Sequence, residues 1–242
     1  MVAVIVLIAS AVSVVWRTTS SFAPYQAGFT WCCQAKEVDA TWVTPTLTGL
    51  DPMANESSWI GVQTGNGFFF QVGVVEHAQE LVQYYLPFWS DGAVKYEPQF
   101  FSDGVNPGDT LHAEIRRSAS KWVATISDLT AHWTASASIS GASGGAQAED
   151  AEWIDEDPVV KVGGQQPTNV SQISAMPTTT CELMFTSLHV NGVSPTTASM
   201  TPFSFVDATG HTFDPAWSGN DAFTVYERPA PARPNGQRLG AC

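Results

Sequence analysis

The chain has 242 residues, of which 23 are acidic and 10 are basic, so its formal net charge is −13. Because a protein that binds a phosphate backbone needs clustered Lys and Arg, this balance argues against nucleic acid as a partner. Hydrophobic residues make up 44% of the chain, which favours a folded domain with a sizeable core over a disordered chain.

The scarcity of basic residues also limits the charge that the protein can acquire in acid. Only the 10 Lys and Arg and the 5 His stay positive once the carboxylates are protonated. We therefore expect mild self-repulsion at low pH. The alternative is that the chain is acidic as many secreted proteins are, with no special adaptation.

Residues 1–20 are expected to be a signal peptide or leader. Met1–Trp16 is an uncharged apolar run, too short to span a bilayer comfortably, and Arg17 follows it. Such a run is typical of the hydrophobic region of a signal peptide. Because Val and Ile dominate it, a buried first strand is the alternative. We expect a secreted protein with no stable membrane association.

Residues 21–228 are expected to form one all-β domain. Short segments rich in Val, Thr, Phe, Trp and Ile alternate with clusters of Gly, Pro, Asn, Asp and Ser, which predicts antiparallel strands in a sandwich or barrel. The expected strands are Val38–Val43, Ser58–Gln63, Gly67–Val75, Thr110–Ile115, Lys121–Ser127, Ala131–Ala137, Ala151–Glu156, Cys181–Val190 and Ala222–Glu227. A short helical turn is predicted near Glu76–Gln83, and no other stretch shows the period of a helix.

Two segments rich in turn-forming residues are predicted to be loops, Ser138–Asp150 and Val159–Thr178. They bracket the acidic strand that ends near Asp157, which places this strand well to line a cleft. The Pro-rich tail, residues 229–242, is expected to be extended or disordered.

The segment Glu152–Asp157 has four acidic residues in six. Strand alternation puts Glu152 and Glu156 on one face with Ile154, and Asp155 on the other. A partly desolvated carboxyl group on such a strand has a raised pKa and can act as an acid or a base. The alternative is a solvated edge strand whose charges prevent aggregation.

Gln71 is a lone amide within an apolar run, so it either ties strands together or faces a cavity. The four cysteines allow three disulfide pairings, among which the sequence does not choose. Neither the cysteines nor the histidines have metal-ligand spacing, so no metal or other cofactor is predicted.

Four segments in this order resemble motifs of the glutamic peptidases, or eqolisins. They are Trp59-Ile60-Gly61-Val62, Gln71-Val72-Gly73, Tyr84-Tyr85-Leu86-Pro87 and Ala151-Glu152-Trp153-Ile154-Asp155-Glu156-Asp157. Upstream, Val38–Pro45 looks like the early strand of the family, and the resemblance extends from about Tyr25 to Glu227.

The resemblance implies an antiparallel sandwich of two large sheets, similar to concanavalin-type lectins, with a substrate groove on a concave face. It implies a catalytic dyad of Gln71 and Glu156, with Trp59, Gln63 and Tyr84 lining the groove and Glu152 not catalytic. The expected activity is that of an acid endopeptidase acting on protein or peptide substrates, as a monomer.

The chain departs from the family pattern in places. Family members often have Asp where this chain has Gln63, and Glu near the position of Tyr84. The early Trp-x-Gly-Tyr element is replaced by Tyr25–Gly28. Two alternatives stay open: a carbohydrate-binding sandwich that uses some of the nine tryptophans, and an inactive relative that retains peptide binding.

Overall fold

The computed structural model describes residues 26–32, 34–47, 55–64, 69–79, 82–91, 95–119, 121–139, 148–156, 182–206 and 210–228. The expected leader, the expected loop Val159–Thr178 and the expected C-terminal tail lie outside these residues.

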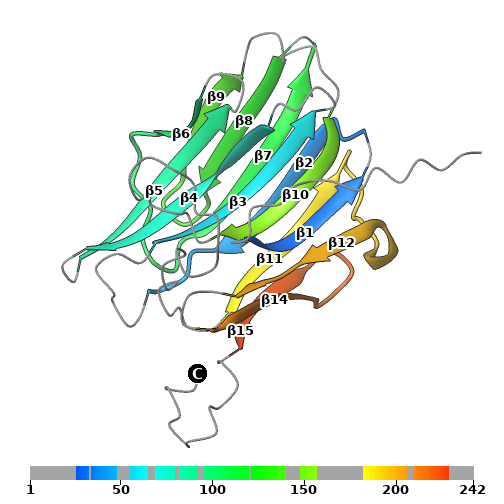
Figure 1. Cartoon of the computed structure of the whole chain (residues 1–242). Helices are drawn as coiled ribbons and strands as arrows, with labels where there is room; N and C mark the ends of the chain where they lie inside the picture. Colours follow the sequence, from blue (N-terminus) through cyan, green and yellow to red (C-terminus); the bar gives the residue numbers. More distant parts are fainter. Residues whose placement is uncertain are drawn as a thin grey trace, which may run out of the picture.

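The described strands form two antiparallel sheets (Figure 1). In spatial order, the seven-stranded sheet consists of β12 (Met200–Phe203), β1 (Gln26–Cys32), β10 (Ala148–Glu156), β3 (Asn55–Thr64), β4 (Phe69–Gln79), β5 (Val82–Asp91) and β6 (Lys95–Phe100). The eight-stranded sheet consists of β13 (Phe205–Val206), β14 (Thr212–Trp217), β15 (Phe223–Arg228), β11 (Glu182–Val190), β2 (Glu37–Val43), β7 (Thr110–Ser118), β8 (Lys121–Asp128) and β9 (Trp133–Ile139). The expected all-β sandwich is confirmed.

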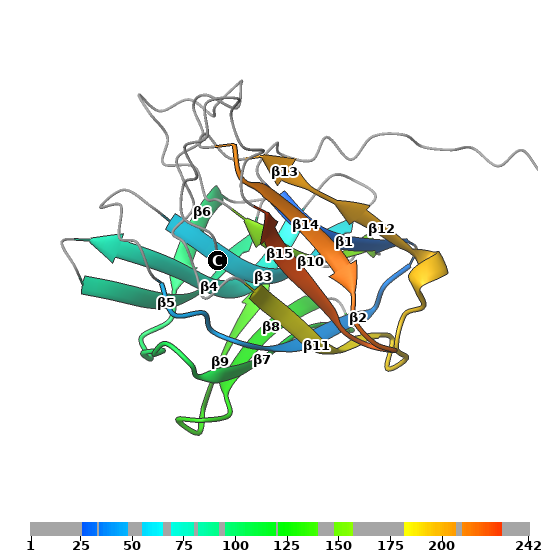
Figure 2. The same ribbon diagram turned by 90° about the horizontal axis from the view of Figure 1, so that it is seen from below.

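The two sheets lie in layers, with the main hydrophobic core between them (Figure 2). Phe29 of β1 packs edge-on against Phe223 of β15, with ring centroids 4.9 Å apart. Trp153 of β10 is fully buried, and its indole Nε1 donates a hydrogen bond to the carbonyl oxygen of Asp39 in β2, at 3.1 Å. Trp153 and its alternates along β10 therefore point toward the other sheet.

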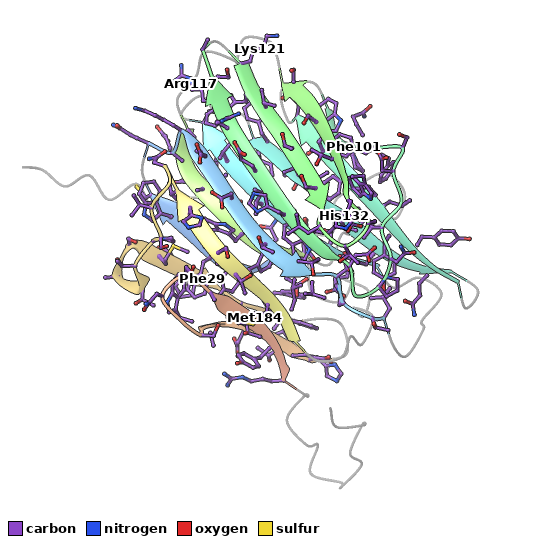
Figure 3. The ribbon with its side chains drawn as sticks, turned by 180° about the vertical axis from the view of Figure 1, so that it is seen from behind. Phe29, Phe101, Arg117, Lys121, His132 and Met184 are labelled. Atoms are coloured by element: carbon purple, nitrogen blue, oxygen red, sulfur yellow. The ribbon has the colours of Figure 1, made fainter. Side chains whose placement is uncertain are left out.

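The outer side of the eight-stranded sheet is a solvent-facing surface, seen in Figure 3 with Met184 exposed on it. Exposed hydroxyl groups pair across β8 and β9, as between Thr125 and Ser136 at 3.0 Å and between Ser127 and Thr134 at 2.9 Å. This face has the polar composition expected of the wet side of an antiparallel sheet.

Two expectations about individual elements are wrong, and so is one alternative. The helical turn predicted near Glu76–Gln83 is not present in its described residues, which form the end of β4 and the start of β5. These two strands pair as a β-hairpin. The loop predicted over Ser138–Asp150 contributes its first two residues to β9 and its last three to β10. β10 also lies between β1 and β3, so it is not an edge strand.

Candidate active site

The face of the seven-stranded sheet that points away from the eight-stranded sheet, called the outer face below, carries a second apolar cluster. Its buried members are Trp59, Phe88 and Ile154. The partly buried side chains packed against them are Phe69, Val75 and Phe203. Large side chains are thus buried on this face as well as in the main core.

Trp59 and Glu156 form a direct hydrogen bond on the outer face. The indole Nε1 of Trp59 donates to Oε2 of Glu156 at 2.7 Å. Trp59 lies opposite Ile154 in the register of β3 and β10, and Glu156 lies opposite Ser57, so the two residues are diagonal neighbours. The structure therefore brings together two of the residues expected at the site.

Two glycines make room for the Trp59 side chain. A Cβ atom on Gly73 would lie 2.1 Å from the carbonyl oxygen of Ser58 and 2.5 Å from Cβ of Trp59. A Cβ atom on Gly61 would lie 2.9 Å from ring atoms of both Trp59 and Phe69, whose rings meet edge-on at 5.4 Å. The glycines of the two expected motifs thus allow the aromatic rings to pack onto the sheet.

Three donors surround the carboxyl group of Glu156. Gln26 of β1 and Ser57 of β3 lie directly opposite Glu156 on either side, and both hydrogen-bond to its side chain along with Trp59. Burial nevertheless raises the pKa of Glu156 to about 7, against the opposing effect of these hydrogen bonds. The group therefore titrates in a range useful for acid–base chemistry.

Gln71 lies on the same face as Glu156 but two strands away. It is paired with Gly61 of β3, which is paired in turn with Glu152 of β10. Gln71 is therefore displaced from Glu156 by four residues along the strands and by two strands across the sheet. In a flat sheet this displacement corresponds to about 16 Å between their Cα atoms. The register thus puts Trp59 of β3 between Glu156 and Gln71 on the outer face.

The two other expected site residues lie in different places on the outer face. Gln63 is opposite Phe69 in the register, so it is a diagonal neighbour of Gln71. Tyr84 is 43% exposed on β5, and it pairs with His77, which pairs with Asn55. Gln63 is therefore near Gln71, whereas Tyr84 lies toward the end of the sheet that holds Glu156, three strands away from it.

Glu152 is a second carboxyl group on the outer face, and it is only 3% exposed. Burial raises its pKa to about 8, with smaller contributions from the nearby charges of Asp150 and Glu156. Glu152 is thus protonated in acidic and neutral solution, and as a neutral acid it cannot accept a proton from water.

A third group of carboxyls lies on the inner side of the same strands and was not expected from the sequence. Glu56, Glu76 and Asp155 are all buried. Glu56 is directly opposite Glu76 and hydrogen-bonds to Asp155, and Ser58 Oγ donates to Oε1 of Glu76 at 3.0 Å. Two carboxyl groups can share a hydrogen bond only if one is protonated, so this inner cluster holds protons.

Strand alternation is the signal that could have located the inner cluster. Glu56 has the same parity as the core residues Ile60 and Val62, and Glu76 has the same parity as Val72 and Val74. By contrast, no local signal marks Gln26, because its place beside Glu156 depends on the pairing of β1 with β10, which are far apart in the sequence.

Other features bear on the class of protein. Among the described residues, no group of three or more His, Cys, Asp or Glu side chains is arranged to hold a metal ion. In the same parts of the chain, no helix has the length and apolar composition needed to cross a membrane. Cys32 is disulfide-bonded, and the other three cysteines lie outside the described residues.

A carboxyl group on the outer face of a β-sandwich, bound by an indole N–H and with a pKa near neutrality, defines a candidate acid–base site. The model of the peptidase A4 family matches residues 23–215. The chain therefore belongs to this family, the eqolisins or glutamic peptidases. No curated protein matches the chain significantly.

Several solved structures share the fold. Scytalido-glutamic peptidase with a peptide-based transition state analogue has a TM-score of 0.69 and 18% identity, covering 85% of this chain and 98% of that one. SCP-B, an eqolisin in complex with the tripeptide Ala-Ile-His, has a TM-score of 0.66 and 19% identity over the same shares. Aspergilloglutamic peptidase from Aspergillus niger has a TM-score of 0.55 and 22% identity, covering 72% of this chain and 99% of that one.

Proposed function

We propose that this protein is a glutamic endopeptidase in which Glu156 and Gln71 hydrolyse peptide bonds. The observation that carries the proposal is the hydrogen-bonded pair Trp59–Glu156 on the outer face, with Gln71 on the same face two strands away. Family membership supports it, as do structural relatives that were crystallised with a transition state analogue and a tripeptide.

In the proposed reaction, the Glu156 carboxylate takes a proton from a water molecule while the water oxygen bonds to the scissile carbonyl carbon. The carbonyl oxygen becomes an oxyanion, which the Gln71 amide N–H stabilises. Protonated Glu156 then gives its proton to the amide nitrogen, and the C–N bond breaks to release an amine and a carboxylic acid. A neutral amide suits the oxyanion role because it does not titrate.

The raised pKa of Glu156 shifts the expected pH range. With a pKa of about 7, about one Glu156 in a thousand carries a charge at pH 4. A reaction that starts from the carboxylate therefore accelerates as the pH rises from strong acid toward neutrality. We propose that the acid endopeptidase expected from the resemblance has a weakly acidic optimum.

The test is cleavage of a denatured protein between pH 3 and pH 7 by the wild type, Glu156→Gln and Gln71→Ala. We expect the wild type to cut and both variants to lose about a hundredfold or more in rate. The matched control is Glu114→Gln on β7 of the other sheet, where Glu114 pairs with Arg116; it should cut like the wild type. Undiminished cleavage by Glu156→Gln would overturn the mechanism.

The carbohydrate-binding alternative is less well supported. Of the eight tryptophans among the described residues, Trp42, Trp59, Trp122 and Trp153 are fully buried. The other four, Trp31, Trp89, Trp133 and Trp217, are partly buried and packed against the core. Sugar stacking needs an accessible ring face. A wild type that binds glycans and never cuts protein would restore this alternative.

We further propose that the protein acts as a secreted monomer on protein or peptide substrates. The disulfide at Cys32 supports an oxidising compartment, in agreement with the apolar N-terminal run. Recovery of the protein from the cells alone, and not from the medium, would contradict secretion.

A further inference from the structure

We propose that Gln26 is a positioning residue that holds the Glu156 carboxyl group in both of its protonation states. This inference rests on the proposed peptidase reaction, in which Glu156 must first accept and then donate a proton. It concerns a residue outside the motifs that carry the family resemblance.

The backbone fixes Gln26 beside Glu156. β1 and β10 pair without a break from Gln26 opposite Glu156 to Cys32 opposite Asp150. Gly28, the next residue of β1 on the outer face, has φ +151°, and a Cβ atom there would lie 2.0 Å from the carbonyl oxygen of Trp153. The close approach of the two strands at Gly28 therefore anchors Gln26 two residues away.

The chemistry of the donors distinguishes Gln26 from Trp59. An indole N–H only donates, so Trp59 supports the carboxylate form of Glu156. A carboxamide donates through Nε2 and accepts through Oε1. Gln26 can therefore donate to the Glu156 carboxylate and, after its amide group rotates by about half a turn, accept a hydrogen bond from the O–H of the acid form. Ser57 has the same dual capacity through its hydroxyl, but it is buried and lies on the opposite side of Glu156.

Among the residues that the structure describes, the charged groups near Glu156 do not offer an alternative partner. On the outer face, the titratable neighbours from β10 are Glu152 and Asp150, whereas the described outer-face residues of β1 and β3 are uncharged. On the inner face lie Asp155 and Glu56. All four are carboxyl groups, so the hydrogen bonds of the uncharged side chains stabilise the Glu156 carboxylate.

The decisive variant is Gln26→Met, which keeps the length of the side chain and removes its hydrogen bond. Because the hydrogen bond to the carboxylate is stronger than the one to the neutral acid, we expect the ascending limb of kcat/KM against pH to move upward by about one pH unit, with kcat reduced about tenfold and KM little changed. A matched control is Thr30→Val, which removes a polar group from the same face of the same strand opposite Glu152. Thr30→Val should leave the midpoint of the ascending limb of kcat/KM against pH unchanged.

A second variant, Gln26→Glu, separates a positioning role from a merely structural one. When protonated, this carboxyl group can donate and accept as the amide does, so activity should approach that of the wild type at low pH. Near neutrality it ionises beside Glu156, so activity should fall below that of the wild type. A structural role would give equal losses at every pH.

NMR of protein labelled with ¹³C-glutamate measures the pKa of Glu156 directly, without an activity assay. The Glu156 signal is assigned from its loss in Glu156→Gln. The Glu156 midpoint should rise by about one unit in Gln26→Met. An unchanged midpoint and an unchanged pH profile in both Gln26 variants would overturn the inference. If the wild type itself does not cleave peptides, or Glu156→Gln cleaves normally, the proposed function fails instead.

Discussion

Glu156 shows two opposing effects at the scale of one residue. Three hydrogen bonds favour its charged form, yet burial raises its pKa to about 7. The removal of water from the carboxyl group therefore outweighs the donors around it. A base with this pKa is strong enough to take a proton from water and weak enough to return it.

Removing one donor should show how much it contributes. In Trp59→Phe the ring stays, but the indole N–H at 2.7 Å from Oε2 of Glu156 is lost. The pKa of Glu156 should rise, so the ascending limb of the pH–rate profile should move up by about one unit. Trp133→Phe on β9 of the other sheet is the control, because it removes an indole N–H that donates to the carbonyl oxygen of Gly104, far from the site. Coinciding profiles for wild type and Trp59→Phe would contradict the assigned role.

Residue-level prediction from the sequence was partly successful. Alternation correctly put Glu152, Ile154 and Glu156 on one face of β10, because the strand period of two is a local property. The sequence could not show that Gln26 and Ser57 flank Glu156, since strand pairing is non-local. Whether Gln71 and Glu156 act together stays a prediction.

At the scale of the strands, small residues of β3 and β4 make room for the large Trp59 side chain. Trp59 of β3 lies opposite Gly73 of β4, and both Gly61 and Gly73 leave the space that the indole and the Phe69 ring fill. The glycines weaken strand propensity, but they permit a packing that no larger residue allows. Their presence in the motifs therefore has a steric reason.

Gly73→Ala should disturb this packing. Its Cβ atom would lie 2.1 Å from the carbonyl oxygen of Ser58, so β3 and β4 would have to move apart at Trp59. We expect a loss of about 1–3 kcal/mol in the free energy of unfolding and reduced activity. Gly104→Ala is the control, since nothing lies within 4 Å of the Cβ atom it would add. Urea unfolding measures both variants, and equal stabilities would refute the steric explanation.

Six of the described strands were not predicted from the sequence, and proline explains four of them; β1 and β13 contain no proline. β5, β6, β12 and β14 each contain a proline, at Pro87, Pro98, Pro202 and Pro215, and proline argues against a strand because it cannot donate to the ladder. β6 and β12 are the edges of the seven-stranded sheet, where this loss is tolerated. The strands without proline and with clear alternation, such as β7 and β8, were predicted correctly.

For the whole molecule, the inner cluster couples folding to pH. Burial raises the pKa values of Glu56 and Glu76 well above their usual range, and neighbouring carboxyl groups, Asp155 among them, add to this. Glu227, which pairs with His211, also faces Glu56. The folded state thus binds more protons than the unfolded state, so stability falls as the pH rises.

The predicted dependence has a defined window. The contribution of Glu56 and Glu76 is fully present below the unfolded pKa of about 4.3 and is lost as the pH rises through their raised folded values. The urea midpoint should therefore decrease between about pH 4 and neutrality. In Glu76→Gln, which keeps an oxygen to accept from Ser58, the decrease should be smaller, whereas Glu114→Gln should follow the wild type. A midpoint that increases toward neutral pH would contradict this account.

The central claim is that Glu156, and not its neighbour Glu152, carries out the chemistry. The most direct test compares kcat/KM of the wild type, Glu156→Gln and Glu152→Gln on one peptide at about pH 6. The pKa of Glu152 is about 8, so this residue is already neutral there and Gln imitates it closely; we expect kcat/KM within about tenfold of the wild type. Glu156 must lose and regain a proton, so Glu156→Gln should fall by a hundredfold to about ten-thousandfold. A large loss in Glu152→Gln together with a retained rate in Glu156→Gln would contradict the account.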